Sequence, residues 1–577
     1  MQNVSTLYKL AMQQPLREPS YMRVMLGVIN QDAQEEASVA HDAVTSFSRS
    51  DIVGAAPSTA SYAGFDCAKV NGRQILLPQG GGAINTGLVS SGLVSESPFA
   101  LELTFPEPVD VKGLTLTFDE NAWPTAFTVT TDNGTTAYEN TAGALWTTDD
   151  AFIYVSYIRF TFTQMSLKTA RLRLKALLLG FGLTYSNDDI IDSEWRSYAS
   201  EISEDMPQVD FSVTLKNYDH YFDSDNPASV VNFLDTDMPI EVHYGMTLED
   251  GSVEWFQAAQ CYIADWSADE RQAVISGTDV LRTMESEYYK GKYYPNGISL
   301  YALAEAVFSD AGIEDYVIDA VLNDVFTKNP LPRVPHKEAL QIIANAARCV
   351  LTVRRDGVPM IVSYSGAMPV ADSVTDFNMT RNDMLSYPVT TNNKAARRID
   401  AIAFFYGDGP GNESLFSDEV TVSAGSEMDV FLTDPSYGYA ASIETGEAVS
   451  IVESGAYYVR VRFAAAGTFK LVISGHKYNV TTSVYSAPIR QNGEVRTWEN
   501  PLISDIDTAA KLATWLASYY GSDVFYEYET RGNPELDPND VIHQENRYLP
   551  EMLVRVREQA VRFNGALSGR MVTKRVI

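Results

Sequence analysis

The densest group of side chains that could bind a metal or move a proton lies between residues 217 and 227, in the stretch NYDHYFDSDNP. It contains Asp219, His220, Asp223 and Asp225. A calcium loop starting at Asp223 would need an oxygen ligand at its fifth position, but Pro227 stands there and no glycine follows at the sixth. The spacing is not that of a catalytic cluster either. We therefore expect these side chains to cap turns, and we predict no metal site.

The remaining sequence contains no motif that predicts a reacting centre. The six histidines form no HExxH or His-x-His pair, which argues against metal-dependent hydrolysis. The run Gly80–Gly82 is not followed by Lys-Ser/Thr, and no GxSxG, Walker or dinucleotide-binding motif occurs. Acidic residues are abundant enough to supply a glycosidase pair, but no pair is marked out. We therefore expect no catalytic residue, no cofactor and no enzymatic activity.

Charge and cysteine content restrict the partners of the chain. Its 577 residues include 43 Lys and Arg against 75 Asp and Glu, a formal net charge of -32. Such a surface repels phosphate backbones and anionic bilayers, so we expect neither sequence-specific nucleic-acid binding nor membrane anchoring. Cys67, Cys261 and Cys349 never form a CxxC pair, which disfavours disulfides and zinc.

Export signals are also missing from the sequence. The N-terminal residues contain no apolar core of secretory-signal length. The most apolar run, Ala176–Leu183, is far shorter than the roughly 20 residues that a membrane helix needs. We therefore expect a soluble protein that is synthesised in the cytoplasm.

Short strands dominate residues 99–183, where ALELTF, GLTLTFD, AFTVTT, YIRFTFT and RLRLKALLLG are separated by turn-forming residues. This texture predicts a β-sandwich. Trp123 and Trp146 fall where loops are expected, so they either cap the ends of the sandwich or bind glycans. The apolar residues expected on its inner faces are Leu101, Leu103, Phe105, Leu114, Leu116, Phe118, Ile158, Phe160 and Phe162.

Periodicity predicts the elements that follow. Val209, Phe211, Val213 and Leu215 alternate with polar residues, which is typical of a strand with one buried face. Helical spacing predicts helices over Ser299–Gly312, Lys337–Cys349 and Ile506–Tyr520, and Asp356-Gly357 predicts a hairpin turn. In the third helix we expect the inward residues to be Ile506, Ala510, Ala513, Leu516, Ala517 and Tyr520.

Several of these segments, in this order, resemble the tail-hub (baseplate hub) proteins of phages and prophages of Gram-positive bacteria. The resemblance is carried by Ser203–Pro227, by Asp279–Leu281 with the turn Tyr288–Tyr294, and by HKEALQIIANAARCVLTVRRDGVPMIV, in which Arg355 and Gly357 match. The C-terminal YEYETRGNPELDPNDVI and VRFNGALSGRMVTKRV also match. Asn539 stands where the family usually has Gly, and Asn tolerates the positive φ expected there.

The sandwich resembles the galactose-binding-like (discoidin-type) jelly roll that many members of this family carry as an insert. The predicted fold class is thus mainly β and multidomain with α+β parts: hub β-barrel-like domains, an inserted jelly-roll β-sandwich and a few amphipathic helices. The expected divisions are an N-terminal arm and first hub strands (1–50), the sandwich (51–183), the continued hub β-domain (184–290), an α/β subdomain (291–370), a second hub β-domain with helix (371–415 plus 488–577) and a small inserted β-module (416–487).

The resemblance implies a structural virion protein of the tail tip or baseplate, which ends the tail tube and joins it to distal components. Its implied partners are two further copies of itself in a homotrimer, the tail tube or distal tail protein, a tail-fibre or receptor-binding protein and, as a further candidate, the tape-measure protein. Two alternatives remain: a glycan-binding adhesin acting through residues 99–182 with Trp123 and Trp146, and a glycoside hydrolase with an appended binding module.

Overall fold

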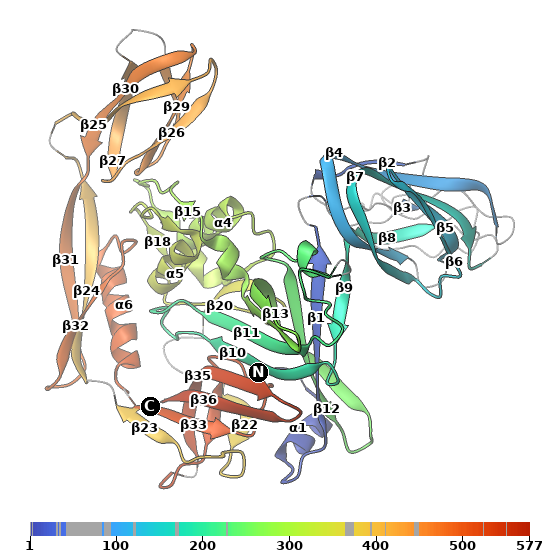
Figure 1. Cartoon of the computed structure of the whole chain (residues 1–577). Coiled ribbons are helices and arrows are strands. Elements are labelled where there is room, and N and C mark those ends of the chain that lie inside the picture. Colours follow the sequence, from blue (N-terminus) through green and yellow to red (C-terminus); the bar gives the residue numbers. More distant parts are fainter. Residues whose placement is uncertain are drawn as a thin grey trace, which may run out of the picture.

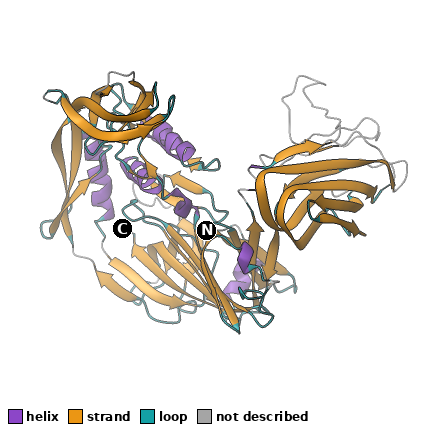
Figure 2. Cartoon of the chain, turned by 45° about the horizontal axis from the view of Figure 1, so that its top comes forward, coloured by secondary structure: helices purple, strands orange, loops and turns teal. Residues whose placement is uncertain are grey.

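Strands make up most of the molecule and helices are few (Figures 1 and 2). This mainly β, multidomain architecture is the predicted fold class. Cys67, Gly80–Gly82 and Pro227 lie outside the described residues. The computed structural model describes the chain except residues 1, 3, 31–32, 34–35, 42–83, 86–93, 119–122, 168–171, 227–228, 364–373, 393–394, 410, 444–448, 523, 550 and 577.

One sheet of thirteen strands forms the centre of the molecule and combines segments from both ends of the chain. β22 (Val374–Met379) and β34 (Val541–Gln544) pair beside its main path. Along that path the strands are β23 (Val389–Asn392), β33 (Val524–Thr530), β36 (Leu567–Arg575), β35 (Met552–Phe563), β10 (Ile190–Tyr198), β11 (Gln208–Lys216), β14 (Gln272–Thr278), β13 (Val253–Ala268), β12 (Pro239–Thr247), β1 (Ser20–Ile29) and β9 (Gly180–Tyr185).

The predicted alternation in β11 is confirmed, because Val209, Phe211, Val213 and Leu215 are buried and their neighbours are not. Two separate hydrophobic cores lie along the sheet, one under β1 and β9–β14 and one under β22 and β33–β36. β10 and β35 pair antiparallel from Ser193–Phe563 to Tyr198–Glu558. This pairing joins the two halves into one continuous sheet.

A seven-stranded unit is inserted between β1 and β9, which are themselves paired neighbours. It lies to one side of the large sheet (Figure 1). All nine apolar residues predicted for its inner faces are buried. Its strands are β2 (Ser38–His41), β3 (Ile84–Asn85), β4 (Val94–Phe118), β5 (Pro124–Thr131), β6 (Gly134–Glu139), β7 (Leu145–Met165) and β8 (Arg173–Leu178).

The α/β region contains the two predicted helices α4 (Leu300–Asp310) and α5 (His336–Ala346). The Ser299 hydroxyl accepts a hydrogen bond from the Ala302 amide as the expected N-cap, and Gly312 follows the helix with φ +73°. β20 (Val350–Val353) and β21 (Pro359–Val362) form the predicted hairpin, in which Gly357 has φ +82°. Smaller elements are η1 (Val231–Phe233), η2 (Val280–Met284), β15 (Glu287–Tyr288), β16 (Ile298–Ser299), β17 (Val317–Ile318), η3 (Ala320–Asp324), β18 (Phe326–Thr327) and β19 (Val334–Pro335).

A long antiparallel ribbon of β24 (Ala396–Gly407) and β31 (Asn479–Pro488) carries a second insert at its far end (Figure 1). β32 (Glu494–Glu499) pairs with β24, and α6 (Ile506–Tyr519) packs against the ribbon. The insert has its own core between two three-stranded sheets. Its strands are β25 (Glu413–Val422), β26 (Glu427–Phe431), β27 (Ser436–Ile443), β28 (Val449–Ser454), β29 (Tyr458–Phe463) and β30 (Gly467–Lys477), and we call it the distal module.

The inward face predicted for α6 is partly wrong. Ile506 is 41 % exposed, whereas Ala509, Leu512 and Tyr519, which the prediction omitted, are buried. A shorter N-terminal helix, α1 (Thr6–Gln13), buries Tyr8 beside β12. Within the described ranges, no helix is long and apolar enough to cross a bilayer.

Candidate functional site

The cluster at residues 219–225 is a set of turns, as predicted. His220 Nδ1 lies 2.6 Å from Asp223 Oδ2, and the Asn217 side-chain amide donates to Asp223 Oδ1 at 2.9 Å. Asp219 Oδ1 accepts a hydrogen bond from the Tyr221 amide at 3.3 Å. The Asp219 and Asp223 carboxylates are thus engaged in local turn geometry, and Asp225 is an exposed residue of the following turn. Among the residues that the structure describes, no group of three or more His, Cys, Asp or Glu side chains is arranged to hold a metal ion.

The two tryptophans singled out for glycan binding pack against the core of the seven-stranded unit. Trp123 precedes β5, and its indole N–H donates to the Thr141 carbonyl at 3.2 Å. Trp146 lies in β7, so the prediction that it sits in a loop is wrong. Its ring contacts Phe127 and Tyr138 edge-on, at centroid distances of 4.8 and 4.7 Å. Glycan binding by either side chain stays a prediction.

Sequence reasoning missed a Ser–His–Asp arrangement in the α/β region, because its members are far apart in the chain. His336 Nδ1 lies 3.2 Å from the Ser286 hydroxyl, and Nε2 lies 3.1 Å from Asp310 Oδ2. However, Nδ1 is only 2.6 Å from the Ser286 backbone carbonyl, an acceptor that requires a proton on this nitrogen. A protonated Nδ1 cannot remove the serine proton, so this arrangement does not activate a nucleophile.

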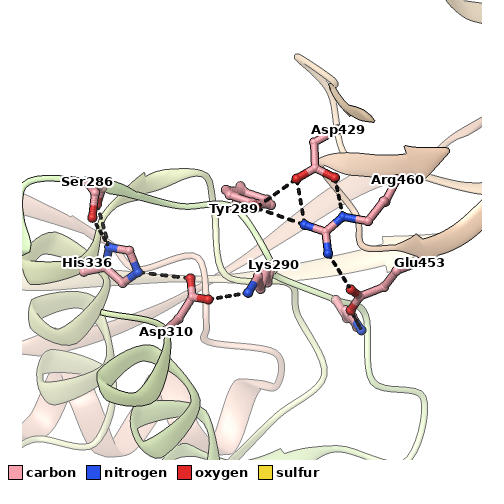
Figure 3. Close-up of polar contacts among 9 residues, drawn as sticks. Ser286, Tyr289, Lys290, Asp310, His336, Asp429, Glu453 and Arg460 are labelled. Carbon is pink, nitrogen blue, oxygen red and sulfur yellow. Dashed lines mark hydrogen bonds and ion pairs between the residues drawn. The ribbon is translucent and has the colours of Figure 1, made fainter. Parts of the chain in front are cut away.

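The same residues belong to one of two neighbouring groups of polar contacts, which the consecutive residues Tyr289 and Lys290 join and which together we call the polar joint. Figure 3 shows one group in the α/β region and the other reaching the distal module. Lys290 pairs with the Asp310 carboxylate. Tyr289 donates its hydroxyl to Asp429 Oδ2 at 3.0 Å. The members of the polar joint are Ser286, Tyr289, Lys290, Lys292, Asp310, His336, Asp429, Glu453 and Arg460.

The module side of the polar joint is built on Arg460. Its guanidinium donates two hydrogen bonds to Asp429, from Nε to Oδ1 at 2.6 Å and from Nη2 to Oδ2 at 2.8 Å. The paired Arg460 lowers the pKa of Asp429, and the Lys292 ammonium, 2.9 Å away, lowers the pKa of Glu453. Bidentate pairs of this kind fix orientation as well as charge. The polar joint therefore sets the position of the distal module.

A backbone hydrogen bond also joins the distal module to the α/β region beside the polar joint. The Ala456 amide donates to the Gly291 carbonyl at 2.7 Å. A Cβ atom on Gly291 would meet the Leu331 carbonyl oxygen at 2.0 Å, so only glycine fits at this position. Gly291 lies in the predicted Tyr288–Tyr294 turn, and the close approach explains the glycine in that motif.

Arg355 in the β20–β21 hairpin connects the α/β region to the large sheet. Its Nε donates to Asp537 Oδ1 at 2.7 Å, and its Nη2 donates to the Leu536 carbonyl at 2.9 Å. The guanidinium lies 5.0 Å from the centre of the Trp195 ring in β10. Although burial opposes ionisation of Asp537, the charge of Arg355 lowers the pKa of that carboxyl. Arg355 thus connects the α/β region to both halves of the large sheet.

The side of the large sheet that faces away from its cores carries charged residues, and we call it the charged face. Arg196 in β10 donates to Glu558 in β35 at 2.9 Å, across the junction of the two halves. Arg562 donates to Asp192 at 2.7 Å, again between β35 and β10. Solvent screens both pairs, because Arg196 and Arg562 are 42 % and 53 % exposed, so each pair contributes little to stability. The residues of the charged face are Asp192, Glu194, Arg196, Asp210, Glu527, Glu558, Arg562 and Arg570.

No family profile and no curated protein matches this chain. Among solved structures, it is similar to the 43 kDa tail protein of prophage MuSo2 from Shewanella oneidensis, with 13% identity over 68% of this chain and 96% of that one and a TM-score of 0.37. It is also similar to the tail protein from Neisseria meningitidis MC58 (9% identity, 67% and 92% covered, TM-score 0.36) and to prophage tail protein gp18 from Listeria monocytogenes EGD-e (10% identity, 67% and 88% covered, TM-score 0.35).

Proposed function

We propose that this chain is a structural subunit of a phage tail tip or baseplate hub, which closes the tail tube and connects it to distal and receptor-binding components. The observation that carries the proposal is the β10–β35 pairing, because it merges two separately cored β-domains into one continuous sheet with a shared charged face. A rigid broad surface of this kind suits assembly between subunits better than it suits catalysis.

The hub resemblance implies a ring of three copies whose hub β-domains imitate a six-fold tube ring. In such a ring the charged face is our candidate for the wall of the channel. Its carboxylates, together with the net charge of -32, would keep passing DNA from adhering. The partners that we propose are the tube or distal tail protein on one side and a fibre or receptor-binding protein on the other.

The test is the mass and shape of the purified full-length protein. Native mass spectrometry is expected to give three times the mass of one chain, and negative-stain images are expected to show rings with a central channel. A monomer at every concentration tested, and in the presence of tail-tube protein, would contradict the proposal.

Glycan binding by the seven-stranded unit is the second candidate function. Trp146, Phe127 and Tyr138 form an aromatic cluster, and the Tyr138 hydroxyl donates to the exposed Asp150 carboxylate at 2.6 Å. Phe127 is buried, but Tyr138 and Trp146 are partly exposed. Two such rings beside a carboxylate supply the stacking and hydrogen bonding that sugars need. Binding on a glycan array that is lost in both Trp123→Ala and Trp146→Ala would support this function. A wild-type protein that binds no glycan would leave the unit as a spacer.

A further inference from the structure

The end of the large sheet at β23 exposes an unusual group of apolar side chains. Leu385, Tyr387 and Val389 are 58 %, 65 % and 64 % exposed. No other five-residue stretch of the described chain holds three large apolar side chains this exposed. We call residues 385–389 the apolar knob.

The backbone pairing of the apolar knob with β33 is irregular, and this irregularity places the knob outside the regular sheet. Met384 bridges to Thr530, and Val389 pairs with Glu527. Between these two pairings the knob segment advances by five residues, whereas β33 advances by only three. This excess makes a bulge. Pro388 also removes one backbone donor from the segment. Both features disfavour a continued backbone ladder, so any contact here is made mainly by side chains.

A cation sits at the base of the apolar knob. The Arg381 guanidinium lies 3.9 Å from the centre of the Tyr387 ring. Its Nη1 donates to the backbone carbonyls of Met384 and Ser386, at 3.4 and 3.0 Å. Within the described part of the chain, no carboxylate side chain pairs with this guanidinium. The knob therefore combines an apolar surface with a positive charge that its own side chains leave uncompensated.

From these contacts we infer that the apolar knob docks onto a second copy of this chain. The argument for this occupant is charge: residues 384–392 contain no charged side chain, while the whole chain has 32 more acidic than basic groups. Elsewhere two copies repel each other, but an uncharged knob beside a guanidinium that is bonded to backbone carbonyls and not to a carboxylate complements an acidic neighbour. The knob also stands at the last strand of the sheet, where a neighbour would meet it end-on. Such a head-to-tail contact can close a ring.

The inference rests on the proposed ring and names its contact. Large exposed aromatic and aliphatic side chains beside arginine are typical of the residues that dominate an interface. The double variant Leu385→Ser/Val389→Ser is therefore expected to raise the dissociation constant of the assembly at least about tenfold. The control is Leu16→Ser, which removes a leucine after α1 that is 89 % exposed, more than the 58 % of Leu385, and is expected to leave the assembly unchanged.

The experiment measures the mass of the full-length proteins by light scattering over a dilution series, with hydrogen exchange of the wild type at both ends of the series. We expect the amides of residues 384–392 to be protected in the assembly and to exchange faster after dilution. If the double variant does not fold, this hydrogen-exchange measurement on the wild type tests the inference by itself. A wild-type ring that the double variant leaves intact, or whose knob amides exchange equally at all concentrations, overturns the inference but not the hub. A wild-type monomer overturns both. Protection of the knob only after a different tail protein is added assigns it to that protein and overturns the inference.

Discussion

The guanidinium of Arg355 and the carboxylate of Asp537 form a 2.7 Å ion pair between segments 182 residues apart. The Arg355 side chain is only 8 % exposed and also lies over the Trp195 ring. The Asp537 side chain is 27 % exposed and also accepts a hydrogen bond from the Gln2 side chain at 2.9 Å, so loss of Arg355 would remove its cationic partner but not all of its contacts. This contact is therefore a place where the α/β region and both halves of the large sheet depend on one side chain.

We predict that Arg355→Ala lowers the free energy of unfolding by about 2–3 kcal/mol, because the charged hydrogen bond to the partly exposed Asp537 and the contact with Trp195 would both be lost. Arg355→Lys is expected to recover only part of this loss, since an ammonium cannot reproduce the planar contacts to Asp537, Leu536 and Trp195. The measurement is the denaturation midpoint of the full chain in urea.

The neighbouring Arg354 is the matched control. It is exposed and pairs with Asp356 within the same turn. Arg354→Ala is expected to change the free energy of unfolding by about 0.5 kcal/mol or less. Equal losses in the Arg354 and Arg355 variants would contradict the role assigned to the buried pair.

A second prediction concerns Arg460 in the polar joint. Arg460→Ala removes both hydrogen bonds to Asp429 and is expected to loosen the distal module from residues 288–292. Hydrogen exchange of the Ala456 amide, which donates to Gly291, should then increase at least several-fold. Arg462 lies two residues further along β29 and pairs with Glu427 in the exposed part of the module. Arg462→Ala should leave this amide as protected as in the wild type; similar exchange in both variants would count against the polar joint.

The third prediction follows from Asp279, the cap of η2. Its Oδ1 accepts from the Leu281 amide at 2.9 Å and its Oδ2 from the Val209 amide at 2.7 Å. Burial raises the pKa of this carboxyl from 3.8 to about 6. Between about pH 4 and pH 6 the folded chain thus binds more protons at this group than the unfolded chain does. The contribution of Asp279 to stability is therefore fully present below pH 4 and is lost as pH rises through 6.

The size of this effect is about 3 kcal/mol, because the pKa of the carboxyl is about 6 in the folded chain and 3.8 ordinarily. Because many other carboxylates titrate in the same range, the useful quantity is the difference between wild type and Asp279→Asn. That difference should favour the wild type more at pH 4 than at pH 7. Asp356→Asn is the control of opposite sign, since Arg354 lowers the pKa of Asp356. A difference for Asp279→Asn that does not change with pH would show that the carboxyl titrates normally.

The fourth prediction uses Asn539, which has φ +74°. Neither polar atom of its buried side chain finds a hydrogen-bond partner within the described residues. Asn539→Gly is expected to keep the free energy of unfolding within about 1 kcal/mol of wild type, because it keeps the turn and removes the unpaired amide. Asn539→Ala should cost about 1–2 kcal/mol more than the glycine variant, since alanine is strained at this φ. Thermal unfolding of the two variants checks the order, which would be reversed if the amide held the turn.

Local patterns were sufficient to predict several elements. Alternation identified β11, capping chemistry placed α4 between Ser299 and Gly312, and the expected positive φ at Asn539 is confirmed. In α6, by contrast, the sequence offers alanines and tyrosines on several sides. Burial there is decided by the ribbon and the α/β region, which place Leu512 inward and leave Ile506 exposed.

The polar joint could not be predicted, because its contacts depend on the tertiary fold. Tyr289 and Asp429 are 140 residues apart, and neither lies in a motif with a known partner. The placement of Trp146 failed for a related reason. Trp146 follows the small residues Ala142, Gly143 and Ala144, which are typical of a loop, yet β7 begins just before it and pairs Trp146 with Leu116.

Both inserts leave and re-enter the framework at neighbouring residues: Ile29 pairs with Gly180 at one site, and Gly407 pairs with Asn479 at the other. The framework strands on either side of each insert therefore keep their register whatever lies between them. Evolution can exchange, lengthen or delete such a block with little penalty to the scaffold, so relatives of this chain can acquire new attachments while the central sheet stays the same.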